Sequence, residues 1–522
     1  MITHRMYVDV LVLGSGLAGL SAAISAADEG LDVLVVSKES ELKECNTFYA
    51  QGGIVFSGEG DSPDLLARDI EQAGAGVCFS DAVRLVAEEG PSLVKRYLID
   101  DVGVEFDVSR EGFDFTREGA HSIRRILHVH DETGRAIELS FLRRVTDHQR
   151  ISLAAGYTAI DLITNSHNSS NPEELYRPTR VMGAYLLDSS GNVLIVFAAA
   201  VVLATGGVGN LFLNTSNPPG ATGDGVAMAY RAGVPIINAH YIQFHPTVLF
   251  HRDLKRLLIT EAFRGEGARL LNHSGEYFME RYSPDKKDLA PRDEVSRAIY
   301  AEMEAEGSDF VFLDARNLDV DIKDRFSNIY AKCLEVGLDI TKDPIPVVPA
   351  AHYFCGGVKT DLSGATIIPG LYAVGECACN GVHGANRLAS VSLLEALVFG
   401  IRAGKDIASR AKKPSKLLMS EIRDWIYPAK EEFFDPVLIE SDLKYLRVLM
   451  WNYVGIVRTR KRLERAMSDI HYLKQRIEQF YKSAEVRKDI VELRNAVLVA
   501  EIITRTAYAN PSSIGCHYIK TD

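Results

Sequence analysis

Apolar residues gather in two short runs near the N-terminus, separated by a glycine-rich turn and a helical stretch. The first run, Tyr7 to Leu13, leads into a turn at residues 14–19, and the second run spans Val33 to Val36. Between them, Leu20 to Glu29 has the pattern of a helix that ends before Gly30. Short apolar runs of this kind predict buried strands, so the order strand–turn–helix–strand predicts the start of an α/β domain.

The turn matches the G-x-G-x-x-G pattern in the structural context that gives this pattern meaning. Its glycines permit a tight turn, a close approach of the backbone to a pyrophosphate, and close packing of helix on strand, while the helix N-terminus attracts phosphates. An acidic residue usually ends the second strand and holds the ribose, whereas this chain reads Ser37-Lys38-Glu39. The turn alone therefore leaves the kind of dinucleotide open. The predicted contacts are Gly14, Ser15, Gly16, Leu17, Ala18 and Gly19.

The rest of the chain divides into three further segments. Residues 1–235 continue as α/β and include another buried run, Ala199 to Ala204. Residues 236–352 have an irregular α+β pattern, and residues 353–412 again show a short strand and a helix, so we expect the middle segment to be an insertion into the first domain. After Pro414, residues 415–522 show apolar positions at helical spacing, which predicts a helical packing domain with charged outer faces.

Composition and charge narrow the classes of function. The chain has 522 residues, a net charge of −12, and 47% hydrophobic residues. The negative charge argues against non-specific nucleic-acid binding and means that an anionic substrate needs a local basic pocket. The longest apolar run, residues 193–204, is too short to cross a membrane, which takes about 20 residues. Seven scattered cysteines predict reduced thiols in a soluble cytoplasmic protein, and Cys377-Ala378-Cys379 lacks the second pair that a metal site would need.

Several predicted loops carry polar side chains that an apolar core would exclude. Taken singly, each has a structural explanation. A lone loop histidine is usually only hydrogen-bonded, and the two arginines Arg264 and Arg292 could be ion-paired to Glu266, Asp293 or Glu294. Taken together, two histidines, a threonine and two or three arginines are the donors that hold two carboxylates. They would also supply the local positive charge. These residues are His245, Thr260, Arg264, Arg292, His352 and Arg387.

The motifs that carry these residues resemble the succinate dehydrogenase/fumarate reductase flavoprotein family, in particular its aspartate-oxidising branch, over nearly the whole chain. The resemblance rests on G-S-G-L-A-G, T-F-Y-A-Q-G-G, A-T-G-G, T-G-D-G, Q-F-H-P-T, T-E-A-F-R-G-E-G, A-P-R-D, A-H-Y-F-C-G-G-V, V-G-E and G-A-N-R-L-A-S-V-S-L-L-E. It implies an α/β fold: a Rossmann-like FAD-binding domain with an inserted α+β capping domain and a C-terminal helical domain. The further FAD contacts that it implies are Ser37, Lys38, Asn46, Thr47, Phe48, Tyr49, Ala50, Gln51, Gly52, Gly53, Ile160, Thr205, Gly206, Asp224, Glu376, Ser392 and Leu393.

Two positions separate the branches of this family. Members that bind FAD covalently carry a histidine just before T-x-x-A-Q-G-G, where this chain has Asn46, so the resemblance implies non-covalent FAD. Glu118 matches an acid that faces the substrate amino group in the aspartate-oxidising branch, where dicarboxylate dehydrogenases have a neutral residue. A carboxylate attracts an ammonium and repels an unaminated dicarboxylate. The alternative interpretation of Glu118 is a surface ion pair with Arg117 or Arg124.

The implied reaction is the oxidation of L-aspartate to iminoaspartate, with O2 or fumarate reoxidising the flavin. It opens NAD biosynthesis, and its product goes to quinolinate synthase. By the resemblance, His245, Thr260, His352 and Arg387 hold the carboxylates, while Arg292, Glu118 and Glu261 are the candidates for proton transfer. A guanidinium is a poor base, so Arg292 would need an acidic partner.

Two alternatives and one departure from the family pattern accompany this prediction. The alternatives are a fumarate reductase or related dicarboxylate dehydrogenase, and a flavin-binding subunit that docks to other proteins. The departure is Ile514, which stands where related chains have an arginine, and we expect it to affect contacts of the C-terminal tail rather than the flavin or substrate sites.

Overall fold

A seven-stranded sheet forms the centre of the first domain in this computed structural model, which describes residues 4–110, 112–428 and 435–521. Six residues of the expected C-terminal domain, 429–434, and its last residue lie outside the described residues. In spatial order the strands are β8 (Ile151–Ala155), β2 (Val33–Ser37), β1 (His4–Leu13), β11 (Val193–Leu203), β10 (Val181–Leu187) and β9 (Thr158–Thr164), with β18 (Leu371–Ala373) also paired to β11. Strands β8, β2, β1, β11 and β18 run parallel to one another, whereas β10 pairs antiparallel with both β11 and β9.

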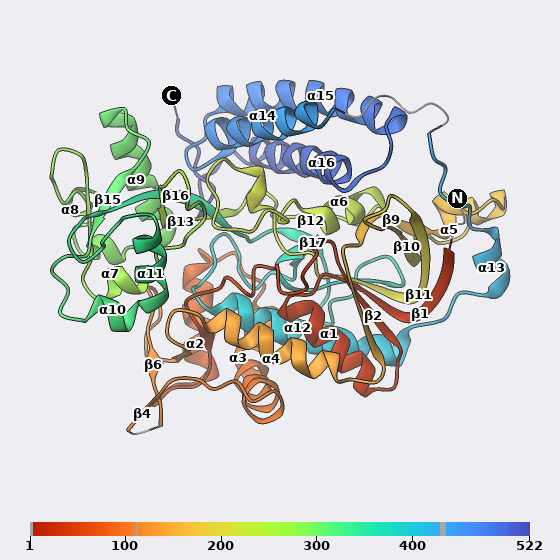
Figure 1. The fold of residues 1–522 in the computed structure, drawn as a ribbon, viewed down its shortest axis with the longest axis horizontal. Coiled ribbons are helices and arrows are strands. Elements are labelled where there is room, and N and C mark those ends of the chain that lie inside the picture. The colour runs from red at the N-terminus through yellow and green to blue at the C-terminus, as the bar shows by residue number, and fades with distance from the viewer. Residues whose placement is uncertain (1–3, 111, 429–434, 522) are drawn as a thin grey trace.

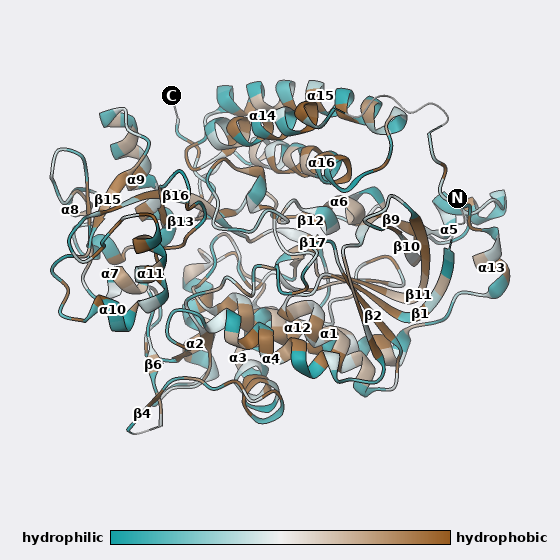
Figure 2. Cartoon of the chain, viewed as in Figure 1, coloured by the Kyte–Doolittle hydropathy of each residue, from teal (hydrophilic) through white to brown (hydrophobic). Residues whose placement is uncertain are grey.

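Helices cover one face of this sheet, where they appear together below it in Figure 1. All residues of β2 and the last four of β1 are buried, as expected for parallel strands covered on both faces. The hydrophobic colouring of β1, β2 and β11 in Figure 2 follows this burial. The covering helices are α1 (Leu17–Asp28), α3 (Ser80–Leu93), α4 (Thr133–Thr146) and α12 (Val391–Arg410).

The segment that begins with β13 forms a second sheet, which is accompanied by five α-helices within the described residues. Its strands β13 (Ile242–Leu249), β16 (Ile345–Phe354), β15 (Val311–Asp314) and β14 (Arg269–Leu271) are antiparallel. Because β13 and β16 are paired, the chain enters and leaves this segment side by side, as an insertion requires. The helices are α7 (Ala262–Gly265), α8 (Met279–Tyr282), α9 (Arg292–Glu306), α10 (Ile322–Arg325) and α11 (Ser327–Glu335).

Three long helices form a separate layer above the first domain in Figure 1. They are α14 (Pro436–Val454), α15 (Arg460–Ser483) and α16 (Lys488–Ala509), preceded by the short α13 (Lys416–Glu421). The most buried of the three is α16, which packs against both α15 and α6 (Asp224–Arg231) of the first domain. Among the described residues, no helix combines the length and the apolar composition needed to cross a bilayer.

Smaller elements connect these layers. Short sheets are formed by β3 (Ile54–Val55), β7 (Ile126–Leu127) and β6 (Phe115–Thr116), by β4 (Val108–Ser109) and β5 (Gly112–Phe113), and by β12 (Ile236–Ile237), β17 (Gly357–Lys359) and β19 (Ala378–Cys379). The remaining helical segments are α2 (Pro63–Ala73), α5 (Asn165–Asn168), a π-helical stretch at Val94–Asp101, and 3-10 turns at Pro172–Tyr176, Gly209–Leu211, Lys287–Leu289 and Gly375–Cys377.

Candidate active site

A cavity of about 620 Å³ lies where the first domain meets the inserted segment. This volume is in the range of small-molecule and cofactor sites. Of the residues that the sequence predicts to contact FAD, all line the cavity except Gly19, which is buried in α1, and Ile160, which is buried in β9. The predicted catalytic and substrate-binding residues line the same cavity: Glu118, His245, Thr260, Glu261, Arg292, His352 and Arg387.

The glycine-rich turn forms one end of this cavity. Gly14 has a φ of +120°, and a Cβ atom there would lie 2.0 Å from the carbonyl oxygen of Ala204, so only glycine fits. Helix α1 begins at Leu17, whose N–H donates to Thr47 Oγ1 at 3.1 Å, and its first turn holds no acid. The remaining N–H groups at this helix N-terminus suit a pyrophosphate in the cavity.

Lys38, at the end of β2, is already paired with protein groups. Its Nζ donates to Thr222 Oγ1 at 2.9 Å and lies 2.5 Å from Asp224 and 2.8 Å from Glu492. Burial alone would lower the pKa of Lys38, but the two carboxylates raise it above its usual value. Lys38 is therefore charged and neutralised, and this end of the cavity has no excess positive charge from it.

Asn46 occupies the position where a covalent flavin link would need a histidine. Its Nδ2 donates to Glu376 at 3.0 Å, and the other oxygen of Glu376 accepts the backbone N–H of Phe354 at 2.9 Å. Burial raises the pKa of Glu376 to about 7, although both hydrogen bonds oppose the rise. An amide held in this way has no nucleophilic nitrogen, so these residues fit an FAD that is not covalently bound.

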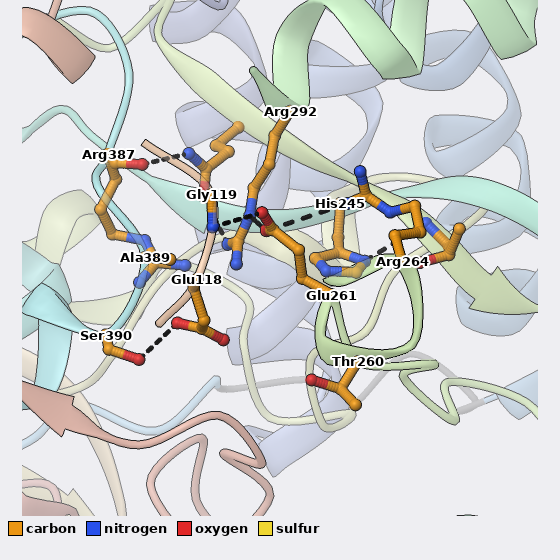
Figure 3. A network of polar contacts seen from close by, with 12 residues as sticks. Glu118, Gly119, His245, Thr260, Glu261, Arg264, Arg292, Arg387, Ala389 and Ser390 are labelled. Carbon is orange, nitrogen blue, oxygen red and sulfur yellow. Dashed lines mark hydrogen bonds and ion pairs between the residues drawn. The ribbon is translucent and has the colours of Figure 1, made fainter. Parts of the chain in front are cut away.

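An ion pair between Arg292 and Glu261 marks the opposite end of the cavity (Figure 3). Arg292 Nε lies 2.7 Å from Glu261, whose other oxygen accepts the N–H of Gly119 at 3.0 Å. Burial would raise the pKa of Glu261, but Arg292 and Arg264 lower it to about 2. Glu261 is consequently ionised, and it holds Arg292 charged. Arg292 is thus ion-paired to Glu261 within the cavity, and Asp293, one of the acids of the structural alternative, pairs with Arg297 instead.

Two neutral imidazoles face each other beside this pair. The rings of His245 and His352 lie 5.2 Å apart. Burial lowers the pKa of both well below the usual value, and nearby arginines add to the effect. His245 Nδ1 accepts the N–H of Thr247 at 3.2 Å, so the proton is on Nε2, which is buried without a partner in the described chain. A buried donor without a partner indicates an acceptor supplied by a ligand.

The guanidinium of Arg387 packs over the aromatic ring of Tyr353. It lies 4.5 Å from the ring centre and donates to Ser392 at 3.0 Å. The Tyr353 hydroxyl in turn donates to Glu395 at 2.8 Å. Arg387 therefore keeps a fixed position with its Nε free of partners among the described residues, which suits it to bind a ligand carboxylate.

Glu118 is buried rather than paired on the surface. Its Oε2 accepts a hydrogen bond from Ser390 at 2.6 Å, and its exposed fraction is 8%. Figure 3 shows it on the same side of the cavity as Ser390 and close to Arg292. The alternative of a surface ion pair with Arg117 or Arg124 is therefore wrong.

Three contacts to these residues were missing from the sequence prediction. Ser390 and Tyr353 lie inside the quoted motifs, but a motif does not reveal which of its members touch one another. Ser216 Oγ lies 2.7 Å from His352 Nδ1 and comes from a polar loop that has no distinguishing pattern.

The described residues of the C-terminal tail do not line the cavity but pack against the loop before Arg387. Cys516 donates its backbone N–H to Ala385 at 2.9 Å, and its Sγ lies 3.2 Å from Asn386 Oδ1. These residues directly precede Arg387. The departure of the tail from the family pattern therefore concerns the loop that carries Arg387, because the tail packs against that loop.

Comparisons with known proteins agree with this geometry. Residues 9–393 match the family model described as FAD binding domain, and residues 443–521 match the one described as fumarate reductase flavoprotein C-term. The chain is 45% identical to L-aspartate oxidase of Yersinia pestis over 98% of its own length and 95% of that protein. It is 42% identical to L-aspartate oxidase of Halobacterium salinarum, covering 99% and 97%.

A solved structure of an E. coli quinol fumarate reductase variant superposes with a TM-score of 0.88, at 26% identity over all of this chain and 92% of the other. The fold and the cavity define an FAD-dependent oxidoreductase of the fumarate reductase flavoprotein type. Within that family, the chain belongs to the L-aspartate oxidases.

Proposed function

We propose that this chain oxidises L-aspartate to iminoaspartate with non-covalently bound FAD, as the first step of NAD biosynthesis. The observation that carries the proposal is the charge balance at the substrate end. Arg292 and Arg387 line the cavity with two positive charges, Glu118 and Glu261 bring two carboxylates, and the two histidines are neutral. Glu261 is engaged by Arg292, whereas Glu118 is oriented by the Ser390 hydroxyl. A Glu118 carboxylate in this place can pair with the ammonium of aspartate, a group that succinate lacks.

The side chains suggest how the substrate is held. Arg387 and the Nε2–H of His245 donate to its carboxylates, with Thr260 and His352 as further donors. FAD, when bound, supplies the acceptor for the hydride that leaves the Cα atom. The protein's part is to orient that Cα–H bond and to exclude water from the buried site.

Proton transfer needs a base for the ammonium, which must lose one proton as the hydride leaves. Arg292 is charged and cannot accept a proton, and Glu261 is a weak base because its pKa is near 2. Burial raises the pKa of Glu118, and Glu261 raises it further, against the influence of the arginines. Glu118 is therefore the best-matched proton acceptor among the three candidates.

We further infer that O2 or fumarate takes the electrons, since fumarate offers the same two carboxylates to Arg387 and His245. The product, an imine that water hydrolyses, passes to quinolinate synthase. The seven cysteines are free thiols, which supports a reducing compartment such as the cytoplasm.

The experiment that tests the function compares two reductants without oxygen. We expect L-aspartate to bleach the flavin absorbance of the purified holoprotein, and succinate to do so far more slowly. Reduction by succinate alone would indicate the rival function of a fumarate reductase or dicarboxylate dehydrogenase. No reduction by either compound would indicate a flavin-binding docking subunit.

A further inference from the structure

We propose that Ser390 is a positioning residue that fixes the Glu118 carboxylate for the substrate ammonium and thereby sets the preference for an aminated dicarboxylate. The inference rests on the function proposed above, because it takes Glu118 to face the amino group. Ser390 lies directly before α12 and lines the same cavity as Glu118. It acts through Glu118 and binds no part of the substrate carboxylates.

The contact between the two residues is short and buried. Ser390 Oγ donates to Glu118 Oε2 at 2.6 Å, and the exposed fraction of Ser390 is 7% (Figure 3). A hydroxyl that donates to a carboxylate over this distance makes a charge-assisted hydrogen bond, which is stronger than one between neutral groups. Such a bond fixes the orientation of the carboxylate and favours its ionised form.

The position of Ser390 at the start of α12 gives a second, independent observation. A serine at a helix N-cap normally accepts a hydrogen bond from a backbone N–H of the first turn. Ser390 makes no such bond, and its φ of +58° lies in the left-handed region that non-glycine residues rarely adopt. The hydroxyl is thus turned away from its usual structural partner and towards Glu118, at a cost in backbone strain.

Neighbouring contacts hold this strained turn in register with Glu118. The carbonyl oxygen of Ala389 lies 2.9 Å from His121 Nε2, and the carbonyl of Ser390 accepts the N–H of Val55 at 3.2 Å. The 118–121 segment is joined to the 389–390 turn by two contacts, Ser390 with Glu118 and Ala389 with His121, while Val55 ties the turn to β3. A double connection places the hydroxyl and the carboxylate more exactly than a single surface contact would.

Charged groups from several elements face Glu118, and they shift its pKa in opposite directions. They are Arg292 from α9, Glu261 and Arg264 from the turn at α7, and Arg387 from the loop before α12. Burial raises the pKa of Glu118 and Glu261 raises it too, whereas Arg292, Ser390 and Arg387 lower it. Removing the hydroxyl removes one of the influences that keep Glu118 ionised. An un-ionised Glu118 no longer attracts an ammonium.

Two substitutions separate the hydroxyl from the backbone strain. Ser390→Ala removes the hydroxyl and keeps the strain, while Ser390→Gly removes both. We expect each to lower kcat/KM for L-aspartate roughly tenfold, mainly through KM, and to move the acid limb of its pH profile up by about one pH unit. The KM for fumarate, measured with chemically reduced holoprotein, stays unchanged. Ser409→Ala, at an exposed position of the same helix, is the matched control.

The two variants distinguish a role of the Ser390 hydroxyl from a role of its backbone conformation. If Ser390→Gly behaves as the wild type and only Ser390→Ala is impaired, the residue acts through its backbone and the inference is wrong. An unmoved acid limb in both variants overturns it as well. Thermal unfolding of each purified variant shows whether a loss of activity is merely a loss of folding.

Glu118→Gln separates this inference from the function on which it rests. If Glu118→Gln impairs aspartate oxidation and spares fumarate reduction, the amino-group role holds, and Ser390→Ala should then add little in the double variant. If Glu118→Gln leaves aspartate oxidation intact, the role proposed for Glu118 fails. If Glu118→Gln impairs it and Ser390→Ala does not, only the inference about Ser390 fails.

Discussion

At the scale of single residues, the partners of a buried acid decide its charge. Glu261 is buried and Glu376 is half-buried, yet burial raises the pKa of Glu376 to about 7 while the arginines beside Glu261 lower its pKa to about 2. Glu376 has only an amide and a backbone N–H as hydrogen-bond donors. One acid is therefore held as an anion, whereas the other, at the far end of the same cavity, is about half protonated at neutral pH.

The raised pKa of Glu376 predicts a dependence of stability on pH in the FAD-free protein. Because its pKa rises from 4.5 to about 7 on folding, the folded state binds the proton more tightly than the unfolded state does. The stabilisation is complete below pH 4.5 and is lost as the pH rises through 7, on the order of 3 kcal/mol. Urea unfolding of wild type and Glu376→Gln at pH 5 and 8 measures it. Equal losses of stability in both proteins would contradict the prediction.

The chemistry-bearing residues of the site could be predicted from the sequence, but their supports could not. Arg387 stands in one of the quoted motifs, and Glu118 was named because its position matches an acid of the family that the chain resembles. The contacts of Ser390 with Glu118 and of Ser216 with His352 join positions 272 and 136 residues apart. Such contacts depend on how the loops pack, which no local pattern encodes.

At the scale of elements, hydrophobic patterning predicted that a strand or helix is present better than it predicted the residue at which that element begins or ends. The first strand was expected from Tyr7 but begins at His4, and the third long strand begins at Val193 rather than Ala199. These extra residues pair with each other, His4 opposite Leu194. The extra residues of β11 belong to the apolar run 193–204, whereas those of β1 are exposed and are strand only because they pair with β11. Pairing between distant strands is a tertiary effect, and for that reason the start of β1 escaped prediction.

The crossing of α1 and α12 predicts a site of steric sensitivity. A Cβ atom on Gly404 of α12 would lie 2.7 Å from the carbonyl oxygen of Ala22 and 2.5 Å from the Cβ of Ser25. Gly404→Ala should therefore lower the free energy of unfolding by about 1–3 kcal/mol despite the better helix propensity of alanine. Lys405→Ala, at an exposed position one residue on, should change it by less than about 0.5 kcal/mol. A stability equal to wild type for Gly404→Ala, in urea unfolding, would show that the helices separate easily.

At the scale of the whole molecule, every layer contributes to the cavity or to its walls. The inserted segment supplies Arg292, the C-terminal tail packs against the loop of Arg387, and α16 reaches the other end. There Lys488 pairs with Glu39 at 2.7 Å, and Glu492 pairs with Lys38. The C-terminal helices are thus tied to the end of β2, where Lys38 is an expected FAD contact, and we expect the packing of this layer to affect cofactor binding.

Asn495 of α16 tests that coupling. It is fully buried, donates to Asp224 at 2.9 Å and accepts from Arg231 at 2.8 Å. Asn495→Ala removes one buried hydrogen bond from each of these charged groups, although Asp224 keeps its ion pair with Lys38 and Arg231 keeps its ion pair with Asp161. We expect a loss of about 2–3 kcal/mol in stability and weaker FAD binding, since Asp224 and its partner Lys38 both line the cavity. Flavin fluorescence during thermal unfolding measures both. Arg505→Ala, exposed on the same helix, should match wild type. Lower stability with unchanged FAD affinity would mean that α16 is a support independent of the cofactor site.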